Sequence, residues 1–474
     1  MIMRSGRWTL SLIAIASSAF SVAAGSGGRG VGQPVAPFDL GAEWRAESDQ
    51  PNGWLGYSVA TAGDVNADGY ADVIAGAYRY DLPGQPDVGI AWAYYGSPTG
   101  LHRSADWTGE GESAGAFFGH SVHTAGDVNH DGYDDVIVGA PNPTNGTKKG
   151  KVYAFYGSAT GLSTTADWMV EGDQEVAWFG RTVRTAGDVN GDGYDDVIVG
   201  APQYDNPEVN EGKAWAYYGS ATGLSTTANW TVESDQANSW FGRWVALAGD
   251  VNGDGYDDVI VDAHQYDDGQ KDEGKAFVYY GSAAGLSTTP AWSAEGNQTR
   301  AWFARAVGPA GDVNGDGYAD IIIGSPMYDD GQLNEGVAFA YYGSAAGLST
   351  TADWMVESGQ KGAMFGRAVW TTGDVNGDGY DDVIVGSPNY DNSGQSDSGR
   401  TFAYYGSATG LSTTAYWTVG LTQARAWFGR SVAKAGDVNG DGYDDVIIGA
   451  PQFDLGQDDE GAAWTFDGSP AGLG

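Results

Sequence analysis

A segment of 24 residues that recurs seven times limits what this chain can fold into more than any other feature. Its clearest copy is FGRTVRTAGDVNGDGYDDVIVGAP, residues 179–202, in which two apolar stretches flank an acidic loop. The first aspartates of successive loops lie 61 to 63 residues apart. A fixed period of this kind indicates copies of one supersecondary unit that stack on each other, rather than two or three unrelated domains.

Each repeat predicts four antiparallel strands. In the third copy these are the tryptophan segment DWMVEGDQ, the Phe-Gly stretch before the loop, the aliphatic stretch DVIVGAP and the aromatic stretch KAWAYYGS. They are rich in β-branched and aromatic residues, and no stretch has the apolar 3.6-residue period of a helix. One four-stranded sheet cannot bury both of its faces, so we expect the seven copies to stack radially into a ring.

The two ends of the repeat region predict how the ring closes. The N-terminal segment AEWRAESDQ matches the tryptophan segment, because Trp44 lies eleven residues before Leu55 as Trp168 lies eleven before Phe179. The last copy ends after its aromatic stretch, AAWTFDGS, and supplies no tryptophan segment. We therefore expect the N-terminal strand to complete the last sheet, which removes an exposed sheet edge.

Each acidic loop has the oxygen-bearing side chains and the spacing of a calcium loop, since Ca²⁺ takes six to eight hard oxygen ligands. The ligands predicted are the side chains at loop positions 1, 3, 5 and 9 and the backbone carbonyl at position 7. Position 1 is Asp64, Asp127, Asp188, Asp250, Asp312, Asp374 and Asp437. Position 3 is Asn66, Asn129, Asn190, Asn252, Asn314, Asn376 and Asn439. Position 5 is Asp68, Asp131, Asp192, Asp254, Asp316, Asp378 and Asp441. Position 7 is Tyr70, Tyr133, Tyr194, Tyr256, Tyr318, Tyr380 and Tyr443. Position 9 is Asp72, Asp135, Asp196, Asp258, Asp320, Asp382 and Asp445.

Differences among the copies separate ligands from their neighbours. Position 8 is Asp in five copies but Ala71 and Ala319 in the other two, whereas position 9 is always Asp, so the ninth residue is assigned as the ligand. An EF-hand would need Glu at position 12 and a following helix, but position 12 is Val199 in an aliphatic stretch. The alternative to a metal site is an acidic turn held by side-chain hydrogen bonds to its own backbone.

Phe-Gly before the loop, Gly-Ala-Pro after it and Asp-x-Asn-x-Asp-Gly-x-x-Asp between them closely resemble the FG-GAP repeats of integrin alpha-subunit N-terminal propellers. The resemblance covers about residues 38–474, with seven copies in phase. It implies an all-β, seven-bladed β-propeller with up to seven mainly structural Ca²⁺ in hairpin loops on one face. It also implies adhesion through the opposite face, built from loops such as QYDNPEVNEG (203–212) and SDQANSW (234–240).

The formal net charge of −39 excludes nucleic acid and anionic membranes as partners, because their phosphate groups would be repelled. Three aspartates in each loop account for 21 of the 62 acidic residues, so bound Ca²⁺ would offset much of this charge. The chain has no cysteine, which excludes disulfides, a thiol nucleophile and thiolate metal sites.

The N-terminal residues predict export. Arg4 and Arg7 precede an apolar run at residues 8–22 and small residues at 23–25, which is typical of a cleaved signal peptide over residues 1–24. Residues 25–37 are Gly- and Pro-rich and predict a flexible linker before the propeller at 38–474. No later apolar run is long enough to span a membrane, so we expect a soluble monomer in the periplasm or outside the cell.

Three further sets of residues recur at fixed places around the Phe-Gly pair. The phenylalanine, Leu55 in the first copy, is predicted to wedge between adjacent blades. The bulky residue before it either packs between blades or forms a ring that stacks sugars, and it is Trp54, Phe117, Trp178, Trp240, Trp302, Met364 and Trp427. Arginine follows the Phe-Gly pair, or Phe-Ala in the fifth copy, in five copies: Arg181, Arg243, Arg305, Arg367 and Arg430. It either pairs with nearby acidic loops or forms an anion or glycan-carboxylate site around the central channel.

No catalytic constellation is recognised. His120, His123 and His130 lie together in the second copy without the spacing of a metal or nucleophile site. In the fourth copy Asp262 and His264 replace Gly and Pro of Gly-Ala-Pro, which indicates either drift or an active pair. We therefore expect a non-catalytic binding or adhesion module with an extracellular protein or glycan ligand. The alternatives are a lectin and, third, an enzyme acting on extracellular polymers.

Overall fold

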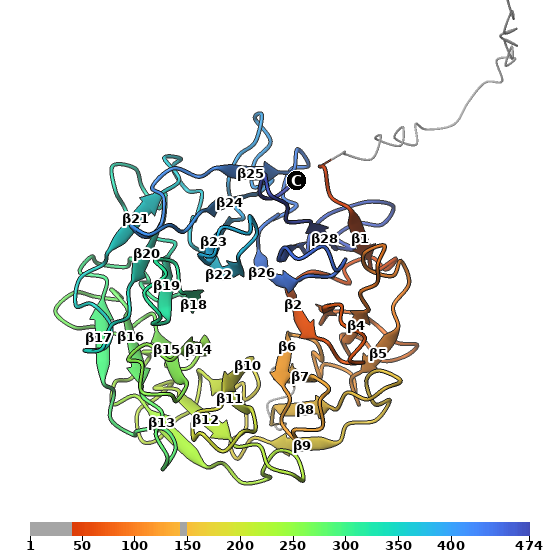
Figure 1. The fold of residues 1–474 in the computed structure, drawn as a ribbon, viewed down its shortest axis with the longest axis horizontal. Coiled ribbons are helices and arrows are strands. Elements are labelled where there is room, and N and C mark those ends of the chain that lie inside the picture. Colours follow the sequence, from red (N-terminus) through yellow and green to blue (C-terminus); the bar gives the residue numbers. More distant parts are fainter. Residues whose placement is uncertain (1–39, 143–148) are drawn as a thin grey trace, which may run out of the picture. The chain divides into compact units, whose positions relative to one another are not determined.

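The seven acidic loops each join two strands of a separate four-stranded antiparallel sheet, and the seven sheets surround a central axis (Figure 1). The computed structural model describes residues 40–142 and 149–474. The innermost strands are β2 (Ser58–Gly63), β6 (Ser121–Gly126), β10 (Thr182–Gly187), β14 (Val245–Gly249), β18 (Ala306–Gly311), β22 (Ala368–Gly373) and β26 (Ser431–Gly436). The second strands are β3 (Asp72–Ala77), β7 (Asp135–Ala140), β11 (Asp196–Ala201), β15 (Asp258–Ala263), β19 (Asp320–Ser325), β23 (Asp382–Ser387) and β27 (Asp445–Ala450). The third strands are β4 (Ile90–Tyr94), β8 (Lys151–Phe155), β12 (Lys213–Tyr217), β16 (Lys275–Tyr279), β20 (Val337–Tyr341), β24 (Arg400–Tyr404) and β28 (Ala462–Phe466). The outermost strands are β5 (Trp107–Glu110), β9 (Trp168–Glu171), β13 (Trp230–Glu233), β17 (Trp292–Glu295), β21 (Trp354–Glu357), β25 (Trp417–Gly420) and β1 (Trp44–Glu47).

The protein is thus a seven-bladed β-propeller with four antiparallel strands in each blade, as the sequence predicts. Blades 1 to 7 are numbered by their innermost strands, from β2 to β26. The signal peptide and linker expected over residues 1–37 lie outside the described residues. Within residues 40–142 and 149–474, no helix is long and apolar enough to cross a membrane.

The predicted ring closure is confirmed. Strand β1 pairs antiparallel with β28, with Trp44 opposite Thr465 and Glu47 opposite Ala462. The hydroxyl of Ser48, just after β1, donates a hydrogen bond of 2.7 Å to the carbonyl of Glu460. Blade 7 therefore takes three strands from the end of the repeat region and one from its start.

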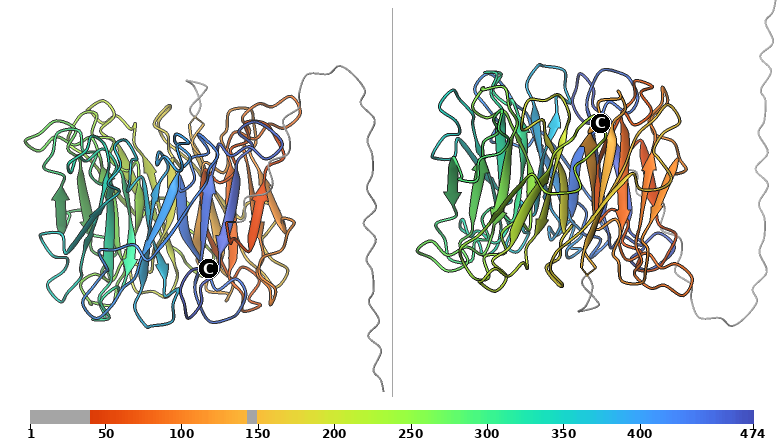
Figure 2. Two further views of the ribbon diagram at one scale, coloured as in Figure 1. Left: turned by 90° about the horizontal axis from the view of Figure 1, so that it is seen from above. Right: turned by 90° about the horizontal axis from the view of Figure 1, so that it is seen from below.

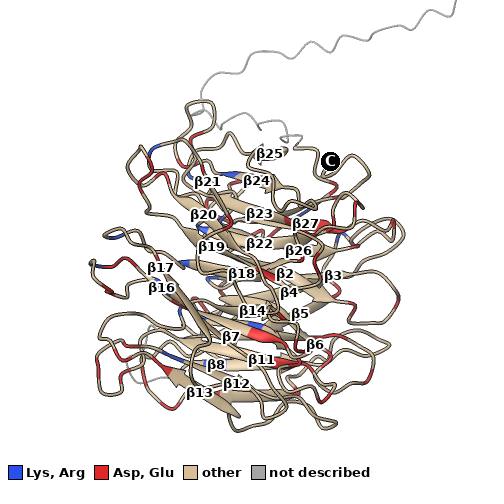
Figure 3. Cartoon of the chain, turned by 60° about the vertical axis from the view of Figure 1, so that its left-hand side comes forward, with Lys and Arg blue, Asp and Glu red and all other residues tan. Residues whose placement is uncertain are grey.

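The strands run along the propeller axis, so the connecting loops gather at its two ends (Figure 2). The acidic-loop face carries the loops between innermost and second strands, such as residues 188–196. The entry face carries the loops through which the chain enters each innermost strand, such as 234–240, and the loops between second and third strands, such as 203–212. Figure 3 shows many Asp and Glu residues in the loops beyond the strand ends.

The Phe of each Phe-Gly pair packs between neighbouring blades, as predicted. Phe241, at the start of blade 4, is 1% exposed and lies in one apolar cluster with Ile198 and Trp230 of blade 3 and Val245 of blade 4. Leu55 has the equivalent place in blade 1 and is fully buried. Each such side chain is therefore part of the core that joins two blades.

The glycines of the repeat allow neighbouring blades to approach each other. Gly200, in the Gly-Ala-Pro of blade 3, lies against Gly242, which follows Phe241 in blade 4. A Cβ added at Gly200 would lie 1.9 Å from the Gly242 carbonyl oxygen, closer than any real contact. A side chain at Gly200 would clash with blade 4, which explains why the two glycines recur together at six of the seven blade contacts. Between blades 4 and 5 their places are taken by Asp262 and Ala304.

Candidate functional site

Each acidic loop is the tight connection between an innermost and a second strand. In blade 3 the β10–β11 ladder shifts register between Thr185 and Gly187, directly before the loop begins. The carboxylate of Asp188 accepts hydrogen bonds from the backbone amides of Gly191, Asp192 and Gly193 at 2.7, 3.1 and 2.8 Å. The side chain at position 1 thus organises the loop around itself, as aspartates do in side-chain-capped turns.

The aspartate at position 9 is the most buried acidic group of the loop. Asp196 is fully buried, and its two oxygens accept hydrogen bonds from the amides of Val189 (3.1 Å) and Gly219 (2.9 Å). Burial, together with the negative charges of Asp192 and Asp188, raises the pKa of Asp196 to about 8 against the opposing effect of these hydrogen bonds. The equivalent aspartates of the other six blades have pKa values raised to about 7 or 8 for the same reason.

The loop residues fit a hard cation chemically. The side-chain oxygens of Asn129 and Asn376, at position 3 of blades 2 and 6, are buried and have no hydrogen-bond partner. A cation would use such free oxygens and would neutralise the carboxylates that burial now disfavours. Side chains at positions 1, 3, 5 and 9 and the carbonyl at position 7 would hold it. Among the described residues no three Asp, Glu, His or Cys side chains converge as a metal cluster by themselves, so calcium stays a prediction.

Position 8, set aside as a neighbour from the sequence, joins adjacent blades. The carboxylate of Asp257 in blade 4 accepts a hydrogen bond of 3.0 Å from the amide of Asp188 in blade 3. The same bond recurs wherever position 8 is aspartate, at 2.8 to 3.1 Å. In the two blades with Ala71 or Ala319 there is no carboxylate to make it. An aspartate at position 8 therefore makes a hydrogen bond between blades, and the two copies with alanine lack it.

The bulky residues before each phenylalanine surround the channel at the entry face. All seven are half-buried and have positive φ between 52° and 61°, in the left-handed region that large side chains rarely adopt. Trp178 and Trp240 also lie beside arginines, with the Arg181 and Arg243 guanidinium carbons 5.7 and 5.5 Å from the ring centroids. These residues are thus packed against their neighbours and remain partly accessible to solvent.

The interpretation of the recurring arginines as partners of the acidic loops is wrong. Arg181 precedes β10 and Asp188 follows it, so the two lie at opposite ends of the same strand. None of the five arginines has a carboxylate within 4.0 Å in the described part of the chain. They gather at the entry face, away from the loops proposed for calcium.

Asp262 and His264 form a buried pair. Asp262 Oδ2 lies 2.9 Å from His264 Nδ1, and Oδ1 accepts a hydrogen bond of 2.6 Å from the Trp244 amide. The two residues are 0% and 2% exposed. Burial raises the pKa of Asp262 to about 7, and burial with the nearby arginine charges holds the pKa of His264 well below its usual value.

The three histidines of the second copy have separate surroundings. His120 packs against the Tyr57 and Tyr78 rings at 5.0 Å, and His123 lies 5.3 Å from the Trp370 ring. His130 lies on the acidic-loop face, 5.8 Å from the Tyr194 ring. They do not form one site.

His123 is expected to make the protein less stable in acid. Burial and then the charge of Arg184 lower its pKa to about 3, so its contribution is present above pH 6.5 and is lost as pH falls toward 3. At pH 5 the unfolding free energy lost in this way is about 2 kcal/mol. His123→Ala, which copies Ala60 at the same place in blade 1, should flatten the fall in unfolding free energy between pH 7 and pH 4, measured by urea unfolding. An unchanged slope would contradict this prediction.

Family comparison decides the class of the repeats. The FG-GAP repeat model matches seven segments, residues 55–94, 118–155, 179–217, 241–279, 303–341, 365–404 and 428–466. The chain belongs to the FG-GAP repeat family. Each matched segment runs from the Phe-Gly pair, or Leu55, through the third strand of one blade.

Curated relatives share the repeat region of this FG-GAP protein. Phosphatidylinositol-glycan-specific phospholipase D from Mus musculus is 27% identical over 71% of this chain and 44% of its own length. Integrin alpha-5 from Xenopus laevis is 28% identical over 52% of this chain and 23% of its own length. The chain thus spans less than half of these relatives. Among solved structures, an exotype rhamnogalacturonan lyase, YesX, aligns with 88% of this chain and 72% of its own, at 15% identity and a TM-score of 0.40.

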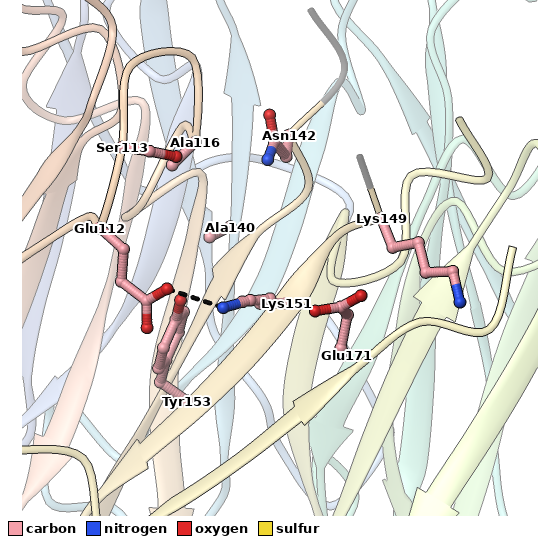
Figure 4. Close-up of a pocket in the computed structure, with 9 residues that line it drawn as sticks. All are labelled: Glu112, Ser113, Ala116, Ala140, Asn142, Lys149, Lys151, Tyr153 and Glu171. Carbon is pink, nitrogen blue, oxygen red and sulfur yellow. Dashed lines mark hydrogen bonds and ion pairs between the residues drawn. The ribbon is translucent and has the colours of Figure 1, made fainter. Parts of the chain in front are cut away.

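A pocket of the FG-GAP propeller lies on blade 2, next to the chain segment that leads into this blade from blade 1 (Figure 4). Asn142 and Lys149 line it on either side of residues 143–148, which are outside the described residues. Lys151 Nζ lies 2.7 Å from Glu112 Oε2. The hydrogen bond with Lys151 lowers the pKa of Glu112 despite partial burial. Lys151 and Glu112 therefore offset each other's charge, while Lys149 and Glu171 also line the pocket.

Two sets of contacts between FG-GAP blades were missed from the sequence. A glutamine in the entry-face loops pairs with the backbone of the loop between a second and a third strand. The side chain of Gln236 donates a hydrogen bond of 2.9 Å to the Asp267 carbonyl and accepts one of 2.6 Å from the Asp267 amide. The tryptophan of the outermost strand donates to a carbonyl of the next blade, as in Trp168 to Ser225 at 2.9 Å. Both residues recur in the sequence, so a comparison of the copies could have found them.

Proposed function

We propose that this protein is an exported, monomeric binding module, stabilised by calcium, that captures an extracellular protein or glycan and does not catalyse a reaction. The observation that carries the proposal is the ring of half-buried aromatic side chains on the entry face. Ligand binding through loops on a rigid propeller is a common use of the fold, and the fold alone does not decide the ligand.

The backbone of this ring supports a binding role. Left-handed φ angles at tryptophan, phenylalanine and methionine cost about 1 to 2 kcal/mol each, and such conformations persist where the surrounding structure holds them for a purpose. Amphipathic aromatic rings contact both protein and sugar surfaces well, so a lectin is the second candidate.

Catalysis has weaker support. The buried pair of Asp262 and His264 lies next to two of the tryptophans that precede the inter-blade phenylalanines. The centroid of the His264 imidazole is 6.0 Å from those of the Trp240 and Trp302 side chains. At 0% and 2% exposure the pair does not reach a polymer lying on the surface. The names of the relatives include both a phospholipase D and an integrin alpha chain, and this chain covers only part of each.

The test is binding of the calcium-loaded protein to a glycan array and, in parallel, to a panel of extracellular-matrix proteins. We expect saturable binding that Trp178→Ala and Trp240→Ala weaken about tenfold, as for aromatic residues central to an interface. Met169→Ala is the control, because Met169 is 43% exposed on the outermost strand β9. Absence of binding on both panels, or equal binding by all three variants, would contradict the proposal. An activity screen with His264→Ala as control addresses the enzyme alternative.

A further inference from the structure

The residue that follows the Phe-Gly pair forms a ring at the entry end of the channel. It directly precedes each innermost strand, and these strands line the centre in Figure 1. The seven residues are Tyr57, His120, Arg181, Arg243, Arg305, Arg367 and Arg430. Contacts between blades join them: Arg181 lies 3.2 Å from His120 Nδ1 and 3.4 Å from the Tyr57 hydroxyl, and the Arg430 guanidinium carbon lies 4.3 Å from the Tyr57 ring centroid.

Three arginines of this ring are buried and two are half-buried, and in the described part of the chain none of them has a carboxylate within 4.0 Å. Arg181, Arg305 and Arg430 are 5%, 3% and 6% exposed. Buried guanidinium nitrogens without a hydrogen-bond partner occur at Arg181 Nε, Arg243 Nε, Arg305 Nη1 and Arg367 Nη1. The carboxylate of Asp262 interacts electrostatically with Arg243 and Arg305, but its two oxygens already form hydrogen bonds with the Trp244 amide and the His264 imidazole. Burying a charged group without a hydrogen-bond partner costs free energy. The ring therefore lacks acceptors for some of its own donors.

The electrostatic potential in the ring is strongly positive. Burial alone would raise the pKa of Tyr57, yet the charges of Arg430, Arg181, Arg367 and Arg243 lower it to about 6. The same neighbours, with burial as the main cause, hold the pKa of Arg367 well below its usual value. This local field is opposite in sign to the net charge of −39.

A second layer of side chains closes the channel below the ring. Arg184 of β10 lies between two tryptophans, with its guanidinium carbon 5.4 Å from the Trp244 ring and 5.6 Å from the Trp370 ring. His123 packs against Trp370 from the opposite side of the channel. Arg184 donates hydrogen bonds to Ser121 Oγ and the Val183 carbonyl at 3.0 and 2.8 Å and keeps a buried, unpartnered Nε. A cavity lies between the two layers, bounded by Tyr57, His120, Arg181, Arg184, Trp244 and Arg430.

We propose that this ring is an oxyanion-binding site, which takes a carboxylate, sulfate or phosphate group that enters from the entry face. Guanidinium groups bind such oxyanions through two parallel N–H donors, and the buried nitrogens without partners supply such donors. This proposal rests on the proposed binding function and adds the chemical class of the ligand. The ligand presents an anionic group to the arginines, while the rest of it contacts the bulky residues that precede the inter-blade phenylalanines.

The test is isothermal titration of the full-length, calcium-loaded protein with sodium sulfate, sodium acetate, digalacturonate and the neutral sugar maltohexaose, all in the same excess of calcium. We expect saturable binding of the anions, a higher thermal midpoint in their presence, and no effect of maltohexaose at this site. Binding of sulfate or acetate would identify a site for free anions, whereas binding of digalacturonate alone would identify one for acidic sugars. Binding should weaken as ionic strength rises.

Variants connect binding to the ring. Arg305→Gln should weaken anion binding about tenfold or more, and Arg305→Lys should weaken it less, since lysine keeps the charge but loses the planar fork. Arg300→Gln is the control, because it removes the same charge from a side chain that is 70% exposed in the entry-face loop before β18. Equal anion binding by Arg305→Gln and the parent, or no anion binding by the parent, would overturn the proposal. In the latter case, binding of neutral glycans or proteins to the aromatic ring would leave the proposed function standing.

Discussion

Removing calcium with a chelator is expected to lower the thermal unfolding midpoint more than any single substitution. If each loop binds Ca²⁺ with a dissociation constant of roughly 0.1 to 1 mM, millimolar calcium adds about 0.4 to 1.4 kcal/mol per loop. Seven loops give roughly 3 to 10 kcal/mol, which is comparable to the whole stability of an ordinary domain. The physical reason is that each loop buries a carboxylate such as Asp196 beside two others, and a cation relieves their repulsion.

The measurement is differential scanning calorimetry in calcium and in excess chelator, followed by re-addition of calcium. Asp192→Asn should remove about one seventh of the calcium-dependent increase, because it changes one loop of the seven. Glu175→Gln neutralises one exposed acidic residue outside the loops and is the matched control. A midpoint that is the same with and without chelator would show that the hydrogen bonds of Asp188 and its equivalents hold the loops without metal.

Truncation of one inter-blade phenylalanine has the second largest expected effect. Phe241→Ala should lower the unfolding free energy by about 3 to 5 kcal/mol, because the side chain is 1% exposed and fills the core between blades 3 and 4. Its ring also contacts that of Phe277, with centroids 5.8 Å apart. Urea unfolding followed by tryptophan fluorescence gives the free energy directly.

The chain supplies its own control for this experiment. Leu55 fills the equivalent place in blade 1, so Phe241→Leu should cost only about 1 kcal/mol. A large difference between the two variants is expected from cavity formation. If Phe241→Ala and Phe241→Leu lose the same small amount, the phenylalanine does not join the blades.

Much of this fold was predictable because each local signal occurs seven times. The strand order, the position of Phe241 in the core and the closure through Trp44 all follow from comparing copies within one chain. Calcium binding by the loops has not been tested and remains a prediction. The recurrence of Asp257 and Gln236 marks both as structural, but it does not name their partners, which lie 69 and 31 residues away along the chain.

The environment of the arginines was misjudged for a geometric reason. Arg181 and Asp188 are close in sequence, but the six residues of β10 between them span about 20 Å in an extended strand. An ion pair with that loop was therefore excluded once the strand was assigned. The floor of the channel was not predictable in the same way, since Trp370 and Arg184 each occur in one copy only and meet across the ring.

The pairing of β1 with β28 has a consequence for how the molecule is made. Ser48 and Glu460, which bond at this seam, are 412 residues apart, so the contact forms only after nearly the whole propeller has been synthesised. Until then the growing chain carries an unpaired sheet edge at each end, and closing the ring requires a very long loop closure. An emerging chain of this kind is therefore exposed to edge pairing with other chains until its last strand arrives.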